Sequence, residues 1–289
     1  MSTDKTRNSE RETRNSKVIT SRDNSLLREA RAVRDGKLDD LIFVEGLRLC
    51  EEALRSHLQI ITVIHSDEIV RKDRAAKLVD ELGAVCERIA SVDEGLLATV
   101  SYTKTPQGMI LIAKSPESGP EALQSKTGRA ELRAELIVIL ARINNPVNVG
   151  AILRSAEAAG ATGVIALSNT ADPFSPKSLR GAMGSAFRLP IWRGASYAET
   201  LAWCANRSIV TVGADLQASK EYTEIDWTVS RALIVGPEST GLTADEVDLA
   251  AESVKIPMHG SAESLNVSVA ASILLYEAAR QRSSHGARV

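Results

Sequence analysis

LIVILARINNPVNVGAILRSAEAAG, residues Leu136 to Gly160, is the stretch that decides the fold of this chain. Its first five residues are apolar and mostly β-branched, as in a strand that is buried on both faces. Asn145-Pro146 then marks a turn, because proline pushes its predecessor out of the helical region. Small and apolar residues follow at helical spacing, and Gly160 is placed to end a helix. The stretch therefore predicts a strand, a polar turn and a helix.

Ligands of such α/β units collect where strand ends meet helix starts. Asn148 and Arg154 follow the turn, six residues apart and hence on different turns of the helix. An asparagine and an arginine at this place can hold a sugar hydroxyl and a phosphate. The ordinary alternative is an asparagine cap and a surface arginine, and this segment alone favours that alternative.

The composition narrows the class of protein. The chain has 289 residues, enough for two domains of ordinary size. Aromatic residues make up only 3%, which predicts an aliphatic core and leaves little material for stacking on bases. A net charge of -2 argues against a strongly basic coat for nucleic acid, although it allows a local basic patch.

The cysteines and the apolar runs indicate the compartment. Cys50, Cys86 and Cys204 lie far apart, with neither a disulfide framework nor a zinc spacing, which fits a reducing cytosol and predicts no metal. There is no long apolar span and no signal peptide, so we expect a cytoplasmic protein without a membrane partner.

The chain divides by composition into four parts. Residues 1–16 are polar without an apolar period and are predicted to be a disordered tail. Residues 17–113 alternate between strand and helix patterns without a concentrated nucleophile, base or metal set, which favours a binding domain. Residues 114–133 are rich in Ser, Pro, Gly and charge and are predicted to be a linker that is partly helical. Residues 134–289 form the second domain.

In the first domain, the apolar runs predict four strands, at 41–44, 60–64, 85–89 and 108–113. The pair Ser91 and Glu94 has the spacing of a capping box at a helix start. Arg28, Arg31 and Arg34 are three apart and can line one face of a helix beginning near Ser25. Two interpretations of these arginines stay open with even weight, a solvated helix face and a face that contacts phosphates.

In the second domain, strands at 136–140, 164–167, 209–212, 232–235 and 253–256 alternate with helices, which predicts a mostly parallel sheet. Three polar turns that contain glycine, residues 144–150, 236–241 and 257–266, each follow a strand and should meet at one edge of that sheet. Their candidate site residues are Asn148, Arg154, Glu238, Ser264 and Asn266. Neither a Gly-Lys-Ser/Thr phosphate loop nor a Gly-x-Gly-x-x-Gly fingerprint is present. The spacing alone thus indicates an α/β enzyme that binds a small polar cofactor in three loops, without naming the reaction.

These turns also carry a resemblance. The segments Asn145–Gly150 with Arg154, Gly236-Pro237-Glu238 with Gly241-Leu242, and Ile256–Met258 with Ser264–Ser268 resemble, in order and spacing, the three motifs of SpoU-type RNA ribose 2′-O-methyltransferases. Lys177 to Phe187 is similar to the family's connecting segment. Val44-Glu45-Gly46 and Thr105-Pro106-Gln107-Gly108 resemble parts of its RNA-binding substrate domain. The resemblance covers about residues 17 to 281. It departs at Asn145, where the family often has an aspartate, although an asparagine can also cap the helix.

The resemblance implies an α/β chain whose C-terminal domain is a parallel sheet with a deep trefoil knot, beside a smaller N-terminal α/β substrate domain. It implies S-adenosylmethionine as cofactor, held by backbone at Gly236, Ile256 and Leu265. It also implies a homodimer with the active site completed across the interface. Its catalytic residues would be Arg154, Asn148, Glu238, Ser264 and Asn266, and we assign RNA contacts to Arg28, Arg31, Arg34, Lys177 and Arg180.

The expected reaction is methyl transfer to a ribose 2′-hydroxyl in structured RNA, with 23S ribosomal RNA favoured over transfer RNA. The alternatives are a transfer RNA 2′-O-methyltransferase and a non-catalytic RNA-binding factor for ribosome assembly on the same scaffold.

Overall fold

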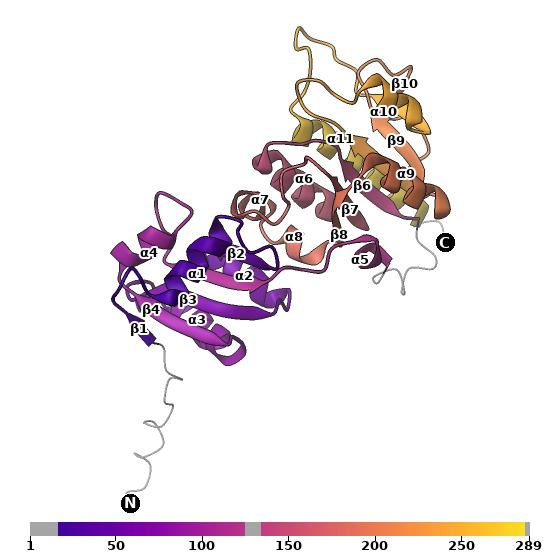
Figure 1. Cartoon of the computed structure of the whole chain (residues 1–289). Helices are drawn as coiled ribbons and strands as arrows, with labels where there is room; N and C mark the ends of the chain where they lie inside the picture. The colour runs from indigo at the N-terminus through magenta and orange to yellow at the C-terminus, as the bar shows by residue number, and fades with distance from the viewer. Residues whose placement is uncertain (1–16, 125–133, 287–289) are drawn as a thin grey trace, which may run out of the picture. The chain divides into compact units, whose positions relative to one another are not determined.

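The computed structural model describes residues 17–124 and 134–286, and the chain forms two compact units (Figure 1). Unit 1 is Met1–Ser115 and unit 2 is Pro116–Val289. The tail expected at residues 1–16 and the linker residues 125–133 lie outside the described residues. In the described part, no helix is both long and apolar enough to span a membrane.

Unit 1 is a five-stranded mixed sheet with helices on both faces. Its elements are β1 (Lys17–Ile19), α1 (Ser25–Arg34), β2 (Leu41–Glu45), α2 (Leu47–Arg55), β3 (Ile60–Ser66), the 3₁₀ turn η1 (Ile69–Arg71), α3 (Asp73–Val85), β4 (Arg88–Val92), α4 (Glu94–Val100) and β5 (Met109–Lys114). The strand order is β1-β4-β3-β5-β2. β1, β4 and β3 are parallel, whereas β5 is antiparallel to both β3 and β2.

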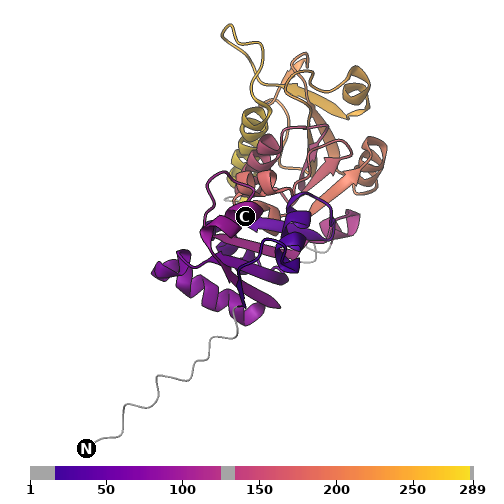
Figure 2. The ribbon, with the colours of Figure 1, turned by 60° about the vertical axis from the view of Figure 1, so that its left-hand side comes forward.

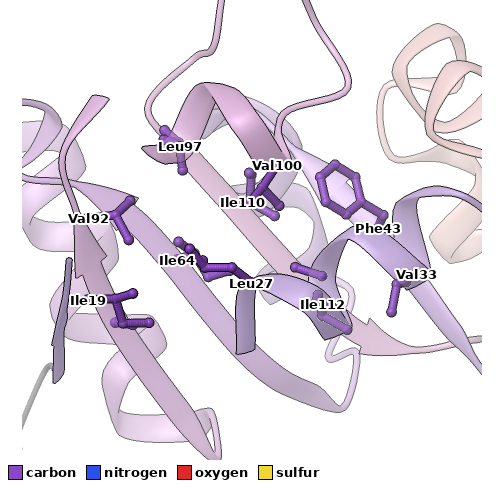
Figure 3. Packing of buried hydrophobic residues seen from close by; sticks show 12 residues of the cluster. Ile19, Leu27, Val33, Phe43, Ile64, Val92, Leu97, Val100, Ile110 and Ile112 are labelled. Carbon is purple, nitrogen blue, oxygen red and sulfur yellow. The ribbon is translucent and has the colours of Figure 1, made fainter. Parts of the chain in front are cut away.

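The aliphatic core expected from the composition fills unit 1. Figure 3 shows Leu27 of α1 beside Ile64 of β3, whereas Val33 of α1 lies on the side of Phe43. The same cluster includes Phe43, the Leu97 and Val100 side chains of α4, and β-branched residues of the strands. Since successive residues of a strand point to opposite faces, the equally buried Val63 packs on the other face, which α3 covers.

Two local predictions for unit 1 were wrong. The strand expected at 85–89 is β4, at Arg88–Val92, because α3 continues through Val85 and Val92 is fully buried. Ser91 does not cap the next helix: Asp93 is the N-cap, and its side chain accepts a hydrogen bond from the Leu96 N–H at 2.9 Å. Both errors come from a shift of a few residues at the end of α3, because the periodicity of apolar residues does not locate the last residue of a helix accurately.

Unit 2 is a seven-stranded, fully parallel sheet, as the alternation of elements predicted. Its elements are α5 (Pro120–Gln124), β6 (Leu136–Leu140), α6 (Pro146–Ala158), β7 (Gly163–Leu167), α7 (Pro176–Ala182), α8 (Ser185–Arg188), β8 (Ile191–Ala195), α9 (Tyr197–Asn206), β9 (Val210–Ala214), β10 (Lys220–Glu221), β11 (Arg231–Val235), α10 (Ala244–Leu249), β12 (Glu252–Lys255) and α11 (Val267–Gly286). The strand order is β10-β12-β9-β11-β6-β7-β8.

The described half of the expected linker is partly built into the two units. Lys114 ends β5, and α5 places Leu123, only 3% exposed, in the core of unit 2. Leu123 packs there with Ile137 of β6 and Cys204 of α9. Burial raises the pKa of the Cys204 thiol to about 12. The three cysteines are free, as their spacing predicted.

The last helix, α11, runs from the carboxyl ends of the strands of unit 2 to the start of β6. It packs against α6 (Figure 2). The Ser155 and Ser272 hydroxyls are 2.7 Å apart. Its first turn lies at the polar turns. Near its end, the Arg282 guanidinium donates to the carbonyls of Ala134 and Glu135, just before β6. α11 therefore ties the loops at the carboxyl edge of the sheet to the start of β6.

Gly150, the last residue of the quoted turn motif, is explained by a close helix contact. A Cβ at Gly150 would lie 2.4 Å from the Ser178 carbonyl oxygen and 2.9 Å from the Gly181 Cα of α7. The backbones of α6 and α7 thus touch at this point, which leaves no room for a side chain. The contact fixes α7 against the helix that carries Asn148 and Arg154.

Candidate functional site

The three polar turns meet at the carboxyl edge of the parallel sheet of unit 2. β6 and β11 are neighbours, so residues 144–150 and 236–241 leave adjacent strands. β12 is separated from β11 by β9, so a fourth turn, residues 214–217 after β9, lies between the last two. Ligands bind at this edge of open parallel sheets. The sequence motifs predicted three of these four turns.

A hydrogen-bonded triangle of side chains joins the three motif turns. Asn266 Nδ2 donates to Glu238 Oε2 at 3.0 Å and to Asn148 Oδ1 at 3.3 Å. Asn148 Nδ2 also donates to Glu238 Oε2, at 3.4 Å. Asn148 is only 8% exposed, so burial removes most hydrogen bonds between its amide and water, and these two partners replace them. Residues 28, 90 and 118 positions apart in the sequence thus form one polar cluster at the sheet edge.

Asparagine caps position two members of this triangle. Asn145 Oδ1 accepts from the Val147 N–H at 3.0 Å and starts α6, so the cap role expected despite the departure from aspartate is confirmed. Asn266 Oδ1 accepts from the Ser268 N–H at 3.0 Å and from its hydroxyl at 2.6 Å, at the start of α11. With its oxygen engaged, Asn266 turns its amide nitrogen toward Glu238 and Asn148.

A pocket lies beside the triangle, with a cavity volume of about 400 Å³. This volume is in the range of small-molecule sites. Its lining includes Gly236, Ile256 and Leu265, the three residues assigned to the cofactor, together with Glu238 and Ser264. The turn after β9 contributes Asp215 and Gln217, which the sequence motifs did not indicate.

One wall of the pocket is a turn that is closed on itself. A Cβ at Gly236 would lie 2.6 Å from the carbonyl carbon of Gly241 and 2.7 Å from the Leu242 nitrogen. Gly241 itself has a φ of +64°, a conformation that glycine adopts most easily. The Gly-Pro-Glu motif therefore needs its glycine, since the backbone of Gly241 and Leu242 occupies the space that a side chain at Gly236 would take.

Arg142 holds that turn, and sequence reasoning missed it. Its guanidinium pairs with the Glu246 carboxylate and lies 3.5 Å from the Gly241 carbonyl oxygen. Burial alone would raise the pKa of Glu246, but the Arg142 guanidinium and the hydrogen bonds from Thr243 outweigh it and hold that pKa below its usual value. Arg142 has a φ of +55°, an uncommon conformation for a residue other than glycine. This outlier, which no sequence pattern reveals, directs the side chain of Arg142 to the pocket wall.

Arg154 and Ser264 are not part of the triangle. Arg154 is exposed on α6 and has no hydrogen bond or ion pair with the described residues. Asn148 lies six residues earlier, so at about 100° per residue the two side chains point about 120° apart around the helix. Ser264 is exposed at the pocket and likewise has no partner in the part of the chain that the structure describes. Both are free to meet a ligand or a second chain.

The five cations assigned to RNA divide into two groups. Lys177 and Arg180 are exposed on α7, the helix that touches α6. Of the three arginines in unit 1, only Arg28 is exposed. Arg31 donates to the Arg22 carbonyl at 2.8 Å, and Arg34 donates to the carbonyls of residues 99, 100 and 101 at 3.1–3.3 Å. The three arginines do not form one free face, because Arg34 caps the end of α4 and Arg31 donates to the Arg22 carbonyl and, at 3.5 Å, to the Thr99 hydroxyl of α4.

Comparison with known proteins accounts for this arrangement. Residues 135–276 match the SpoU rRNA Methylase family, and residues 43–119 match the family described as RNA 2′-O ribose methyltransferase substrate binding. The 23S rRNA (guanosine(2553)-2′-O)-methyltransferase RlmP of Bacillus subtilis is 34% identical over 236 residues, which is 81% of this chain and 86% of that protein. The chain belongs to the SpoU rRNA Methylase family. A second relative, the 23S rRNA (uridine(2479)-2′-O)-methyltransferase of Streptomyces viridochromogenes, is 35% identical over 68% of each chain.

Solved structures of SpoU-family proteins share the fold of this chain. The AdoMet-bound rRNA methyltransferase of Sinorhizobium meliloti aligns with a TM-score of 0.78 and 30% identity over 92% of this chain and 98% of its own. The SpoU methyltransferase AviRb of Streptomyces viridochromogenes, in complex with AdoMet, gives 0.79 and 30% identity over 90% and 99%. The expected architecture, a parallel-sheet C-terminal domain and a smaller N-terminal α/β domain, is therefore shared with these solved structures.

Proposed function

We propose that this chain transfers a methyl group from S-adenosylmethionine to a ribose 2′-hydroxyl of 23S ribosomal RNA. The observation that carries the proposal is the triangle of Asn148, Glu238 and Asn266 beside the pocket, which joins all three motif turns. The two relatives above are named as enzymes of this reaction on 23S rRNA. Such a substrate also implies the cytoplasm as the place of reaction.

The pocket fits the cofactor by its walls. Gly236 keeps the turn after β11 closed, and Ile256 and Leu265 complete a partly apolar lining with backbone groups. When bound, the cofactor supplies a methyl group already activated by its sulfonium. The chain must then align the ribose oxygen with that methyl group and ease the loss of the hydroxyl proton. The fixed amides of Asn148 and Asn266 and the carboxylate of Glu238 orient that sugar.

Arg154 is the residue that we assign to the phosphate beside the target ribose, where its charge also polarises the hydroxyl. A guanidinium stays protonated in proteins, so it acts as a bidentate clamp and not as a base. Because Arg154 points away from the face of α6 that carries Asn148, it would serve the pocket of a second copy of the chain.

A homodimer with shared active sites follows from this geometry as part of the proposal. α6 and α11, which pack together, carry exposed apolar residues: Val147 is 46%, Val269 47% and Tyr276 55% exposed. An interface there would bury these side chains and bring Arg154 of one copy near the other. Its isologous symmetry would complete both sites at once.

The reaction is tested by incubating the purified chain with labelled S-adenosylmethionine and an unmodified 23S rRNA transcript. We expect label in the RNA, at a position that is mapped as a ribose 2′-O-methyl group. Transfer to transfer RNA alone would overturn the choice of substrate. Cofactor binding without transfer to any RNA would overturn the reaction itself and favour a binding factor.

We expect Arg142→Ala to weaken cofactor binding about tenfold, because hydrogen bonds to charged groups contribute roughly 1.5–3 kcal/mol. The substitution removes the partner of Glu246 and of the Gly241 carbonyl and lets the closed turn open. Isothermal titration of S-adenosylmethionine gives the Kd. Arg71→Ala, which removes an exposed ion pair in unit 1, is the matched control and should leave the Kd unchanged. An unaltered Kd for Arg142→Ala would show that the turn closes without this arginine.

A further inference from the structure

The loop between α4 and β5, residues 101–108, is held in a single conformation by an acidic side chain. The Glu45 carboxylate at the end of β2 accepts from the Ser101 hydroxyl, from the Thr103 hydroxyl at 2.8 Å, and from the Tyr102 N–H at 2.8 Å. It also lies 3.3 Å from the Thr103 nitrogen. Charge-assisted hydrogen bonds of this kind are stronger than neutral ones. One carboxylate therefore anchors three successive residues of the loop.

The base of the loop has further anchors. The Arg34 guanidinium donates to the Ser101 carbonyl at 3.3 Å and to the two carbonyls before it. At the other end, the Ser66 N–H donates to the Gly108 carbonyl at 2.9 Å. Gln107 lies against Gly46, where a Cβ would be 2.3 Å from the Gln107 Oε1. The arginine that the sequence suggested for RNA contact thus positions this loop.

The anchored loop presents an aromatic ring and an amine to solvent. Unit 1 has only two aromatic residues, Phe43 in the core and Tyr102, which is 45% exposed. The Tyr102 hydroxyl and the Lys104 amine make no hydrogen bond or ion pair with the described residues, and Lys104 is exposed. A lone exposed ring needs no explanation. The loop that carries Tyr102, however, has a backbone that is fixed by Glu45 and Arg34. Because fixing a backbone costs conformational entropy, the exposed position of this ring calls for an explanation.

We propose that the loop 101–108 is an RNA-contact surface, on which the Tyr102 ring stacks on an unpaired base and Lys104 contacts a neighbouring phosphate. Aromatic side chains on fixed supports are how proteins hold unpaired bases, and a nearby cation follows the backbone. The inference rests on the proposed function for its ligand class and names where unit 1 meets RNA. Two motif segments of the sequence, at 44–46 and 105–108, meet at this loop.

The test compares RNA affinity across four variants of the full chain, by filter binding to the unmodified 23S rRNA transcript without turnover. Tyr102→Ala should weaken binding about tenfold, whereas Tyr102→Phe, which keeps the ring, should stay within about twofold. Lys104→Ala should weaken binding about threefold at low salt and less at high salt, since phosphate contacts depend on salt. Lys77→Ala removes an exposed lysine on α3 and is the charge-matched control.

Two further measurements separate a contact role from misfolding. Thermal unfolding and the Kd for S-adenosylmethionine should be the same for Tyr102→Ala and wild type, and the loss should appear in KM for RNA and not in kcat. Equal RNA affinity of Tyr102→Ala and wild type would overturn the assignment, even if wild type methylates the transcript. If wild type binds RNA through Tyr102 but transfers no methyl group, the loop assignment holds and the proposed reaction fails. A wild-type chain that binds no RNA overturns the loop assignment.

Discussion

Arg154→Ala should lower methyl transfer at least about a hundredfold, the scale of losing a group that aids proton transfer or stabilises developing charge. The expected Kd for S-adenosylmethionine is unchanged, because Arg154 has no hydrogen bond or ion pair with the described residues and lies outside the pocket lining. Transfer of label under single-turnover conditions measures the first quantity, and isothermal titration measures the second.

Arg180→Ala on α7 is the matched control, since it removes another exposed arginine from the same helix pair. As a phosphate contact it should raise KM for RNA a few-fold and leave the single-turnover rate at saturating RNA unchanged. Loss of both transfer and cofactor binding in Arg154→Ala would make this arginine structural. An effect of Arg154→Ala confined to KM for RNA would reduce it to one more phosphate contact.

The parallel sheet and the meeting of the three motif turns could be predicted from the sequence, because both follow from short segments whose residue types alone indicate strands and turns. An apolar run such as Leu136–Leu140 has few alternatives to a buried strand, and Asn145-Pro146 has few alternatives to a turn before a helix. The parallel order of strands then places all such turns at one edge. Asn148, Glu238 and Asn266 needed only that placement to become neighbours.

The features that the sequence could not provide depend on pairings between distant segments. Arg142 reaches the pocket wall because of a positive φ, and Asp215 lines the pocket because β9 lies between β11 and β12. Arg34 has the spacing of a solvated helix face, yet it caps α4 because that helix ends beside it. In each case the local pattern is compatible with several roles, and tertiary packing selects one.

Gly236→Ala should weaken S-adenosylmethionine binding about five- to a hundredfold, the equivalent of the roughly 1–3 kcal/mol that overpacking costs. The new Cβ would lie 2.6 Å from the Gly241 carbonyl carbon, so the turn must open and the pocket wall must move. Gly260→Ala is the control, because no atom lies within 4 Å of a Cβ there. The Kd from isothermal titration decides the matter, and equal values for the two variants would show that the wall tolerates a side chain.

The two deficient variants together test whether the site is shared between copies. Arg154→Ala keeps its pocket but lacks the guanidinium, whereas Gly236→Ala keeps the guanidinium but has a weakened pocket. If Arg154 serves the pocket of the other copy, a mixed dimer contains one complete site, and random exchange of subunits should restore about a quarter of wild-type transfer. If Arg154 serves its own chain, neither subunit of the mixed dimer is complete. Verified exchange without restored transfer would then exclude a site built across the interface.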